Sequence, residues 1–531
     1  MSQPWFYVDK ESAEAGETVR LFATSPSSPC ALKITYIGKT ENLVAAYDNI
    51  QIGDHPIPEN ADTNGCDWPE AFGFVVADDW RSGYYDLELT AADGSSSRSF
   101  ICVRNASSSQ KTDGVLILST NTYQSYNYWG GSNSYACVDK LMAGEVTADE
   151  SRAGAIGKLS RKRPYAQGLL AVPQDVPRLI NLERRPVGEP AFAGTLEWIT
   201  ANQPTPYDFS ACFLNKWEHK FITWCDENGY PLDVITDHDL EQGQDVLDGY
   251  KTVFLVGHSE YWSANGRDAV EAFVADGGNL ACLSGNTCYW KIRWEDDGDT
   301  MIAHKAKGEE NDPLWADPAT RDDATHFWSH PAFDRPEAQM MGLSFLYGGY
   351  HRLGMCVARG NAGMTVYDDE HWALEDTDLY YGDVIGSDIP FVGYENDGCP
   401  IKFGPSGLPA PDGGLGVPQD FEIIAFTPAT LAEDPRSPYP PIIPREAFDV
   451  LSKIAYGSDD ADTQKKLSRG QAVMGSVKIV KGEVFNSGTT EWAHGLAAKD
   501  PFVEKITHNV MNRFGVHQRK NLTTIPVAAL R

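Results

Sequence analysis

The segment Lys251–Trp294 reads KTVFLVGHSEYWSANGRDAVEAFVADGGNLACLSGNTCYWKIRW, and we expect the rest of the chain to be arranged around it. Its first part, Thr252–Val256, is a short β-branched apolar run, which is typical of a strand buried on both faces of a parallel sheet. A helix is predicted next, because Ser263 is a suitable N-cap and the apolar residues after it recur at helical spacing. The apolar run Leu280–Leu283 then predicts a second strand. Such a strand–helix–strand unit places its strands in parallel with a right-handed crossover.

A loop containing a Tyr-Trp pair follows each of these two predicted strands. The loops are GHSEYW and SGNTCYW, and they emerge at the same edge of the sheet because the strands are parallel. Ligands of open α/β sheets bind at this edge. We therefore expect Tyr261 and Tyr289 to face one crevice. The polar residues of the two loops are His258, Glu260 and Asn286. A single aromatic residue after a strand most often packs against a helix, but two matching pairs favour a site.

Composition and charge restrict the class of protein. A chain of 531 residues exceeds one typical core, so two or three domains are expected. The 75 Asp and Glu against 44 Lys and Arg give a net charge of −31, which disfavours nucleic acid and anionic membranes as partners. One compact basic patch, Arg161–Gly168, is predicted to be a solvated face. The polar start MSQPWFYVDKESAEAG, the lack of a run of about 20 apolar residues and 10 scattered cysteines predict a cytoplasmic protein with free thiols.

The order of patterns along the chain predicts two domains. Residues 1–104 alternate in the manner of strands, which predicts a small Ig-like β-sandwich. The Ser-rich segment 105–113 predicts a linker. Residues 114–531 combine buried strands with helical patterns, which predicts a doubly wound α/β domain with β insertions. The acidic stretch from about 295 to 335 is longer than a normal connection, so we expect an insertion that either covers the crevice or is mobile.

Further elements are predicted on both sides of the opening segment. Val115–Leu118 and Leu232–Ile235 are predicted strands, and Phe209–Asn228 has a helical pattern. The first of these strands leads into NTYQSYNYWGGSNSY, a loop rich in aromatic residues and asparagine that also follows a strand's C-terminal end. Val473–Phe485 predicts a hairpin, and Phe502–Phe514 predicts a final amphipathic helix.

The residue types in these loops suit a metal with oxygen ligands. Phenolates and carboxylates are hard donors, so two tyrosines and a glutamate would suit trivalent iron better than zinc, which prefers nitrogen and sulfur. A bound cation would stabilise deprotonated tyrosine, whose reference pKa is about 10. The spacing of the tyrosines alone is a weak signal for such a site.

A series of motifs over roughly residues 115–515 resembles the large (beta) subunit of N,N-dimethylformamidase. These are GHSEYWS, GGNLACLSGNTCYWKIRW, HFWSHPAFDRPEAQMMG, DEHWALEDTDLYYGDVIG, IPFVGYENDG and VFNSGTTEWAHGL. The resemblance implies a glutamine-amidotransferase-like core, a mononuclear Fe(III) and hydrolysis of the C–N bond of a small amide. It implies Tyr261, Tyr289 and Glu395 as the iron ligands, with Glu370 or Glu422 as alternatives to Glu395. The large subunits of this kind are longer and work with a small helical subunit, so we expect a homo-oligomer and a separate small subunit.

The implied reaction polarises the amide carbonyl, or activates a bound water, at the metal. The candidates for proton transfer are His258, Glu260, Asp397 and His494, and the candidate donors to a developing oxyanion are Asn127 and Asn286. For each of them, a hydrogen-bonded structural role is an equally good interpretation.

Two other functions remain open from the sequence. An amidotransferase-like core normally presents a nucleophilic cysteine at a strand-to-helix elbow, and Cys282 and Cys288 flank that place. The sequence LACLSGNTCYW lacks a Gly-x-Cys-x-Gly elbow, however, and no His-x-Glu pair follows. The other alternative is a non-enzymatic α/β protein that binds carbohydrate or another ligand by aromatic stacking.

Overall fold

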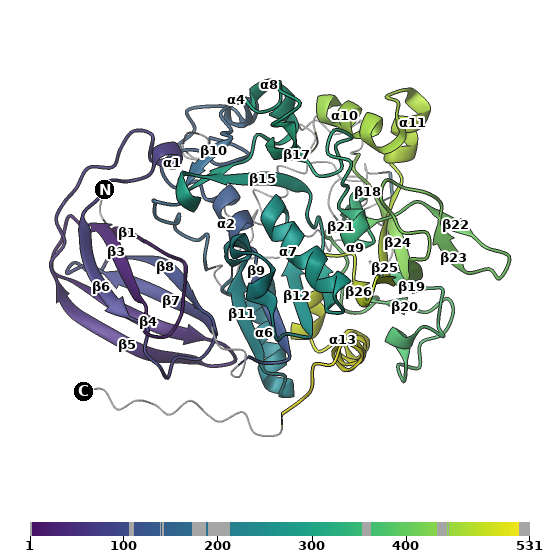
Figure 1. The fold of residues 1–531 in the computed structure, drawn as a ribbon, viewed down its shortest axis with the longest axis horizontal. Helices are drawn as coiled ribbons and strands as arrows, with labels where there is room; N and C mark the ends of the chain where they lie inside the picture. The colour runs from purple at the N-terminus through teal and green to yellow at the C-terminus, as the bar shows by residue number, and fades with distance from the viewer. Residues whose placement is uncertain are drawn as a thin grey trace.

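The computed structural model describes residues 3–105, 111–137, 140, 143–171, 187–188, 213–352, 363–432, 443 and 445–519. Its central element is a nine-stranded sheet (Figure 1). In spatial order the strands are β11 (Leu232–Thr236), β9 (Gly114–Leu118), β12 (Thr252–Gly257), β14 (Asn279–Ser284), β26 (Gly482–Asn486), β25 (Gly470–Ile479), β24 (Glu422–Ala429), β19 (Met364–Val366) and β20 (Val384–Ile385). Neighbours from β11 to β26 are parallel, and neighbours from β26 to β20 are antiparallel. The chain is therefore an α/β protein, as predicted.

The strand–helix–strand unit predicted from the opening segment is confirmed. Strands β12 and β14 pair in parallel, and α7 (Ala264–Ala275) connects them. The Ser263 hydroxyl accepts a hydrogen bond from the backbone N–H of Gly266 at 3.0 Å, which caps the helix as expected. Val270 and Phe273 lie on its buried face.

The other predicted elements are also present, with changed bounds. The helix expected from residue 209 is α6 (Trp217–Asn228), and residues 209–212 lie outside the described residues. The remaining helices near the sheet are α2 (Thr120–Tyr126), α12 (Trp492–Ala497) and α13 (Pro501–Arg513). The predicted hairpin is formed by β25 and β26, and the predicted final helix is α13.

The order of the parallel strands creates a switch point in the sheet. After β9 the chain forms β11 on one side of β9, and it then forms β12 on the other side. At such a point the segments that follow the two central strands leave the sheet in opposite directions and open a crevice at its carboxyl edge. Here these segments are α2, which follows β9, and the GHSEYW loop, which follows β12.

The N-terminal part of the chain forms two further sheets. One contains β1 (Trp5–Val8), β3 (Thr18–Thr24) and β6 (Glu70–Val75); the other contains β2 (Ser12–Ala13), β8 (Ser96–Val103), β7 (Gly83–Thr90), β4 (Cys30–Ile37) and β5 (Glu41–Ile50). Side chains from both sheets, including Leu21 and Leu87, form a common core. This sandwich lies beside the β11 edge of the central sheet, at the left of Figure 1.

Side chains of the sandwich satisfy backbone groups at the outer edge of β11. The Ser82 hydroxyl donates to the Val234 carbonyl at 3.2 Å and accepts from the Val234 N–H at 2.8 Å. The Cys102 thiol also donates to the Val234 carbonyl, at 3.2 Å. Tyr84 and Phe100 of the sandwich belong to the same hydrophobic core as the central sheet. The two parts of the chain are therefore packed together rather than joined only by the segment between Val103 and Gly114.

The acidic stretch from 295 to 335 contains regular structure. A separate sheet contains β10 (Lys158–Ser160), β16 (Thr300–Ile302), β15 (Trp290–Glu295), β13 (Tyr261–Ser263) and β17 (His326–Phe327). The 3-10 turn η4 (Lys305–Lys307) follows β16 and approaches the loops at the switch point. One residue of this stretch, Lys305, lies over the ring of Tyr135 in the segment after β9.

The basic patch near Arg163 is a solvated face only in part: Lys162 is exposed, as predicted, whereas Arg163 is buried, so the prediction was wrong for Arg163. The Arg163 side chain is buried and donates to the carbonyl groups of Trp129 at 2.7 Å, Asn127 at 2.9 Å and Ser160 at 3.0 Å. One of these three bonds comes from the Nε atom and the other two come from the two terminal nitrogen atoms, so the whole guanidinium takes part. Arg163 thus satisfies backbone acceptors beyond the end of α2.

Two further findings concern the cysteines and the membrane. All cysteines within the described residues are free, and all of them except Cys137 are buried. No helix among the described residues is both long and apolar enough to cross a bilayer.

Candidate functional site

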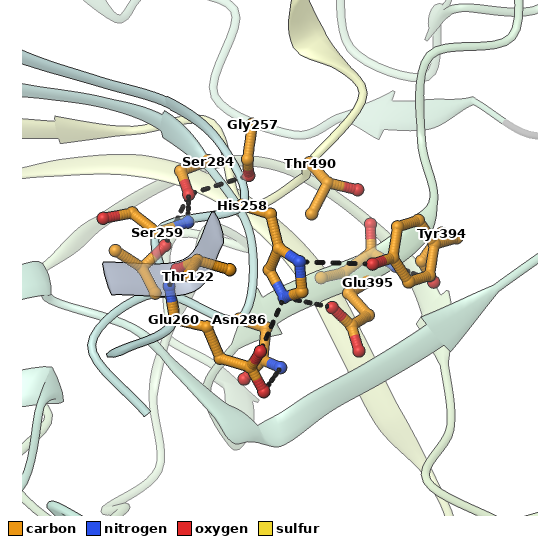
Figure 2. A network of polar contacts seen from close by, with 12 residues as sticks. Thr122, Gly257, His258, Ser259, Glu260, Ser284, Asn286, Tyr394, Glu395 and Thr490 are labelled. Atoms are coloured by element: carbon orange, nitrogen blue, oxygen red, sulfur yellow. Dashed lines mark hydrogen bonds and ion pairs between the residues drawn. The ribbon is translucent and has the colours of Figure 1, made fainter. Parts of the chain in front are cut away.

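Three segments that are distant in sequence meet at the switch point of the central sheet. His258 and Glu260 follow β12, Tyr126 lies at the end of α2, and Glu395 lies in β21 (Tyr394–Gly398). The backbone N–H of Glu260 donates to the Thr122 hydroxyl at 3.1 Å, which fixes the β12 loop against α2. Figure 2 shows the His258 imidazole between Glu260 and Glu395 on one side and Tyr394 on the other.

The Glu260 carboxylate is the centre of this group. Its side chain is buried, and it accepts hydrogen bonds from Tyr135 at 2.9 and 2.8 Å and from Tyr126 at 3.3 Å. The indole N–H of Trp290 donates to it at 2.7 Å, and the Asn286 amide donates at 3.2 Å. A buried carboxylate needs such donors because it has lost its hydration.

A second buried carboxylate lies on the other side of His258. The Nε2 atom of His258 is 2.8 Å from Oε2 of Glu395 and 3.3 Å from Oε2 of Glu260, and its Nδ1 atom is 3.3 Å from the Tyr394 hydroxyl. Burial acts to lower the pKa of His258, but the two carboxylates outweigh it and raise that pKa. Within the described part of the chain, neither His258 Nε2 nor Glu395 Oε2 makes a well-oriented hydrogen bond. The contact between them is therefore an ion pair at 2.8 Å rather than a well-oriented hydrogen bond.

The insertion adds a cation to the site. The Lys305 ammonium lies 3.1 Å from the centre of the Tyr135 ring and 4.9 Å from that of Trp290, and it donates to the Ser134 carbonyl at 3.2 Å. Burial lowers the pKa of Lys305 to about 7, while Glu260 and Glu395 oppose this change. The backbone of Lys305 has φ +58°, in the left-handed region that residues with side chains rarely adopt.

The electrostatic balance of the site favours protons or another cation between its oxygen atoms. Burial and the charge of Glu395 raise the pKa of Glu260, although His258 and Lys305 act in the opposite direction. Burial and the charge of Glu260 also raise the pKa values of Tyr126 and Tyr135. Both phenols thus keep their protons and direct them at the carboxylate when no cation is bound.

The three metal ligands implied by the family resemblance lie in different surroundings. The Tyr261 hydroxyl donates to the Tyr135 hydroxyl at 2.7 Å, so Tyr261 belongs to the group around Glu260. Glu395 faces His258. The Tyr289 ring packs against Phe327 and Phe345, with ring centres 5.0 and 5.3 Å apart, and none of its described contacts is to Tyr261 or Glu395. Burial raises the pKa of Tyr289, and the charge of Glu337, followed by those of Glu260 and Glu395, adds to this effect.

The predicted proton-transfer and oxyanion residues separate into two groups. His258, Glu260 and Asn286 lie in the site, as described above. Asp397 is buried and accepts from the backbone N–H groups of Asn286 at 2.9 Å and Thr287 at 3.3 Å, so it holds the SGNTCYW loop. Burial raises the pKa of Asp397 to about 7.

None of the described contacts of His494 or Asn127 is to the Glu260 carboxylate. His494 is in α12, and its Nε2 atom is 3.4 Å from Oε2 of Glu491. The Asn127 amide donates to the Pro164 carbonyl at 2.9 Å, and its oxygen accepts from the backbone N–H groups of Trp129 and Ala166 at 3.2 and 3.0 Å. These three contacts of the Asn127 amide hold loops after α2.

Sequence reasoning did not assign roles to Tyr126, Tyr135, Trp290 and Lys305. The two tyrosines both lie in NTYQSYNYWGGSNSY, so a signal for them existed, although this segment was expected to be a loop and its first part forms α2. Because β9 and β12 are neighbours at the switch point, this loop was the natural partner of GHSEYW. Lys305 lies in an acidic stretch without apolar periodicity, and no local pattern in the sequence indicates its position.

The cysteines proposed as alternative nucleophiles are poorly suited to that role. The Cys282 thiol lies 3.6 Å from the Thr287 hydroxyl, and burial raises its pKa to about 12. Burial also raises the pKa of Cys288. A reactive thiol normally has a lowered pKa and some access to solvent, and both cysteines are fully buried.

The site combines carboxylates with phenols and does not contain a conventional metal-binding triad among the described residues. Among the described residues, no three or more histidine, cysteine, aspartate and glutamate side chains form a group that could hold a metal ion. The oxygen donors of the site include Tyr126 and Tyr135, which both contact the Glu260 carboxylate.

The fold and the site define an α/β protein in which partly buried phenols meet buried carboxylates and a buried histidine at the switch point of its sheet. Residues 34–508 match the family described as N,N-dimethylformamidase beta subunit-like, C-terminal. The chain belongs to this family, as the sequence motifs predicted.

Individual relatives match a much shorter part of the chain. The N,N-dimethylformamidase beta subunit of Paracoccus aminophilus is 44% identical over 72 residues, which is 13% of this chain and 9% of that protein. The subunit of the same name from an Alcaligenes species is 43% identical over 72 residues, with the same coverage of 13% and 9%. These alignments therefore span under a tenth of the relatives' length.

A comparison with solved structures gives a cycloisomaltooligosaccharide glucanotransferase from a Paenibacillus species. It is 9% identical, covers 53% of this chain and 48% of its own, and has a TM-score of 0.18. A similarity this low carries no structural or functional argument.

Proposed function

We propose that this chain is an amide hydrolase that cleaves the C–N bond of a small amide. The proposed site is the Glu260 cluster, which consists of Tyr126, Tyr135, His258, Glu260 and Glu395. Membership of a family named after N,N-dimethylformamidase supports the reaction class. The observation that carries the proposal is the meeting of two phenols with one buried carboxylate beside a histidine–carboxylate pair. The amidotransferase-like description of the core is part of this proposal, and the parallel strands with a switch point support it.

We also propose a mononuclear Fe(III), and the oxygen atoms of the cluster suit it. Adjacent ligands of a small hard cation lie about 2.8 Å apart when each is about 2.0 Å from the metal. The Tyr135 oxygen is 2.9 and 2.8 Å from the Glu260 oxygens, and the Tyr126 oxygen is 3.3 Å from Oε2. Replacing the phenol protons with a cation would also relieve the excess of buried acidic groups. Tyr126, Tyr135 and Glu260 are therefore the ligands we favour.

The set implied by the family resemblance, Tyr261, Tyr289 and Glu395, is the alternative. Tyr261 and Glu395 lie at the edges of the same cluster. Tyr261 contacts Tyr135, and Glu395 contacts His258. Tyr289 is surrounded by aromatic rings. The metal content of single variants distinguishes the two sets.

A bound Fe(III) would act as a Lewis acid, which polarises a carbonyl group and lowers the pKa of a bound water. The chain's own residues are placed to handle the protons of hydrolysis, in which a C–O bond to water forms and the C–N bond breaks. Oε2 of Glu395, which lies 2.8 Å from His258 Nε2, is the group that we propose takes the proton of the attacking water. The His258 imidazole, held between the two carboxylates, is placed to deliver a proton to the departing amine nitrogen.

Burial of these groups restricts the substrate. The side chains of His258, Glu260 and Glu395 are almost inaccessible to solvent, and the insertion places Lys305 over Tyr135. Such a site suits a compact amide with short substituents, and exclusion of water strengthens each electrostatic contact in it.

Both relatives are named as beta subunits, and on this ground we propose that a separate small subunit and further copies of the chain complete the assembly. The composition supports a cytoplasmic location and a small neutral substrate rather than nucleic acid.

The test uses the purified full-length chain, alone and together with any co-purifying small subunit. Iron is measured by elemental analysis, the visible spectrum is recorded, and amine release is followed with formamide, N-methylformamide, N,N-dimethylformamide and acetamide. We expect close to one iron per chain, a visible tyrosinate-to-iron band and amine release from at least one amide. Colourless, iron-free protein that releases no amine would contradict the proposal.

A further inference from the structure

The phenol of Tyr261 contacts Tyr135 on the side away from the carboxylate. The Tyr261 and Tyr135 oxygens are 2.7 Å apart, while the Tyr135 proton is directed at the Glu260 oxygens 2.9 and 2.8 Å away. A phenol has a single proton, so Tyr135 cannot also donate to Tyr261. Tyr261 is therefore the donor and Tyr135 the acceptor in this hydrogen bond.

The position of Tyr261 is fixed by the sheet that covers the site. In the parallel pairing of β13 with β15, Tyr261 is the register partner of Trp290. The Asn121 amide donates to the Tyr261 carbonyl at 3.1 Å, and the Tyr261 side chain is buried. The two register partners thus present one donor each to the cluster: Trp290 to Glu260 at 2.7 Å and Tyr261 to Tyr135.

We infer that Tyr261 is a positioning residue that tunes Tyr135 as a metal ligand, rather than a ligand itself. This inference rests on the proposed function, since it assumes that Tyr135 binds the metal as a phenolate. When Tyr135 loses its proton, Tyr261 remains a donor, and the hydrogen bond becomes charge-assisted and stronger. Donation to a bound phenolate withdraws electron density from it, which leaves the metal a stronger Lewis acid.

Loss of this hydrogen bond has a spectroscopic consequence. A phenolate without its donor has a higher-energy lone pair, so less energy is needed to transfer an electron from it to iron. We therefore expect Tyr261→Phe to keep its iron, to move the visible band to longer wavelength and to lower kcat about 10- to 100-fold, the range typical of groups that orient metal ligands. KM should change little, because the Tyr261 hydroxyl contacts Tyr135 rather than the His258–Glu395 pair to which we assign proton transfer.

The matched control is Tyr230→Phe. Tyr230 is also buried, and its hydroxyl has a described contact of 2.8 Å with Nδ1 of His508, away from the Glu260 cluster. This variant also loses a buried hydroxyl contact, and it should leave the visible band and kcat as they are. Both variants are compared with the wild-type chain for iron content, visible spectrum, kcat and KM in the same preparation.

Resonance Raman spectra of the wild-type protein test the hydrogen bond without a substitution that affects folding. After equilibration in D2O, the vibrations of one tyrosinate should shift because an exchangeable proton donates to it. The absence of a shift would overturn the inference, and so would an unchanged visible band in iron-loaded Tyr261→Phe. Loss of iron from Tyr261→Phe would make Tyr261 a ligand, which overturns this inference but supports the iron site. An iron-free wild-type chain would instead contradict the proposed function and this inference with it.

Discussion

The Tyr135 hydroxyl lies within hydrogen-bonding distance of both carboxylate oxygens of Glu260, at 2.9 and 2.8 Å, although the residues are 125 positions apart. This contact joins the segment after β9 to the loop after β12. It places the acidic part of the site at the switch point of the sheet, where the fold alone predicts a ligand.

The first prediction separates metal binding from proton transfer. We expect Glu260→Gln to lose most of its iron, because the neutral amide is a weaker ligand and no longer balances the cation. Glu395→Gln should keep its iron and lose at least about a hundredfold in kcat, since it can no longer accept a proton. Iron content and amine release measured on the same samples give both answers. Loss of iron from Glu395→Gln and its retention in Glu260→Gln would favour the ligand set implied by the family resemblance.

The second prediction concerns the two phenols. Tyr126→Phe and Tyr135→Phe should each reduce iron content and weaken the visible band, while Tyr289→Phe should leave both unchanged. The reason is that Tyr126 and Tyr135 contact Glu260, whereas Tyr289 lies among Phe327 and Phe345. Iron loss confined to Tyr289→Phe would place the metal on the other side of the cluster.

The third prediction tests the thiol mechanism. Cys282→Ser and Cys288→Ser should each change kcat by a few-fold at most, because both thiols are buried with raised pKa values and stand outside the cluster. An essential nucleophile typically costs on the order of a thousandfold or more. Abolished turnover with iron intact in either variant would support a cysteine-dependent hydrolase.

The fourth prediction is a pH dependence of stability that arises outside the site. Glu218 is fully buried, accepts from the Tyr123 hydroxyl at 2.8 Å, and has a pKa that burial raises to about 7. Its folded-state pKa lies above its unfolded value, so its contribution to stability is present at low pH and is lost as the pH rises towards 7. Glu218→Gln should therefore be more stable than the wild type at pH 8, and this advantage should disappear near pH 4.

Thermal unfolding of both proteins between pH 4 and pH 8 measures this effect. The exposed residue Glu310 provides the control, because Glu310→Gln removes a carboxylate that is already in water. An equal pH dependence for wild type and Glu218→Gln would show that Glu218 is ionised in the folded protein.

The fifth prediction links the sandwich to the site. Glu11, between β1 and β2, accepts hydrogen bonds from the Tyr165 hydroxyl and from the Gln124 amide of α2, the latter at 3.2 Å. Because α2 carries Tyr126, Glu11→Ala should lower both the melting temperature and the iron content. Glu17→Ala breaks the partly exposed pair with Lys10 in the same sandwich and should have an effect below about 1 kcal/mol. Unchanged iron content in Glu11→Ala would show that α2 keeps its place without the sandwich.

Local patterns in the sequence predicted the parts of the fold that depend on them. The apolar runs of β9, β11, β12 and β14 and the cap of α7 were found because buried parallel strands and capped helices have local signals. His258, Glu260 and Asn286 were identified as site residues because they follow two strands joined by one helix.

The remaining parts of the site depend on the order of the strands. The neighbour relation of β9 and β12 brings Tyr126 and Tyr135 to Glu260, and no local periodicity encodes it. Lys305 is placed by a short strand pairing within an acidic stretch. The prediction that Arg163 is solvated was wrong. A basic cluster in a sequence is usually solvated, but the Arg163 guanidinium donates hydrogen bonds to carbonyl groups after α2.

The contact of Ser82 with Val234 has a consequence for solubility. Strand β11 is an outer strand of the central sheet, and an uncovered outer strand offers backbone donors and acceptors to any other chain in an extended conformation. The sandwich occupies these groups with the Ser82 hydroxyl and the Cys102 thiol. A chain that lacks residues 1–104 would expose a ready template for strand addition and would aggregate through β11, even if every residue around Glu260 were intact.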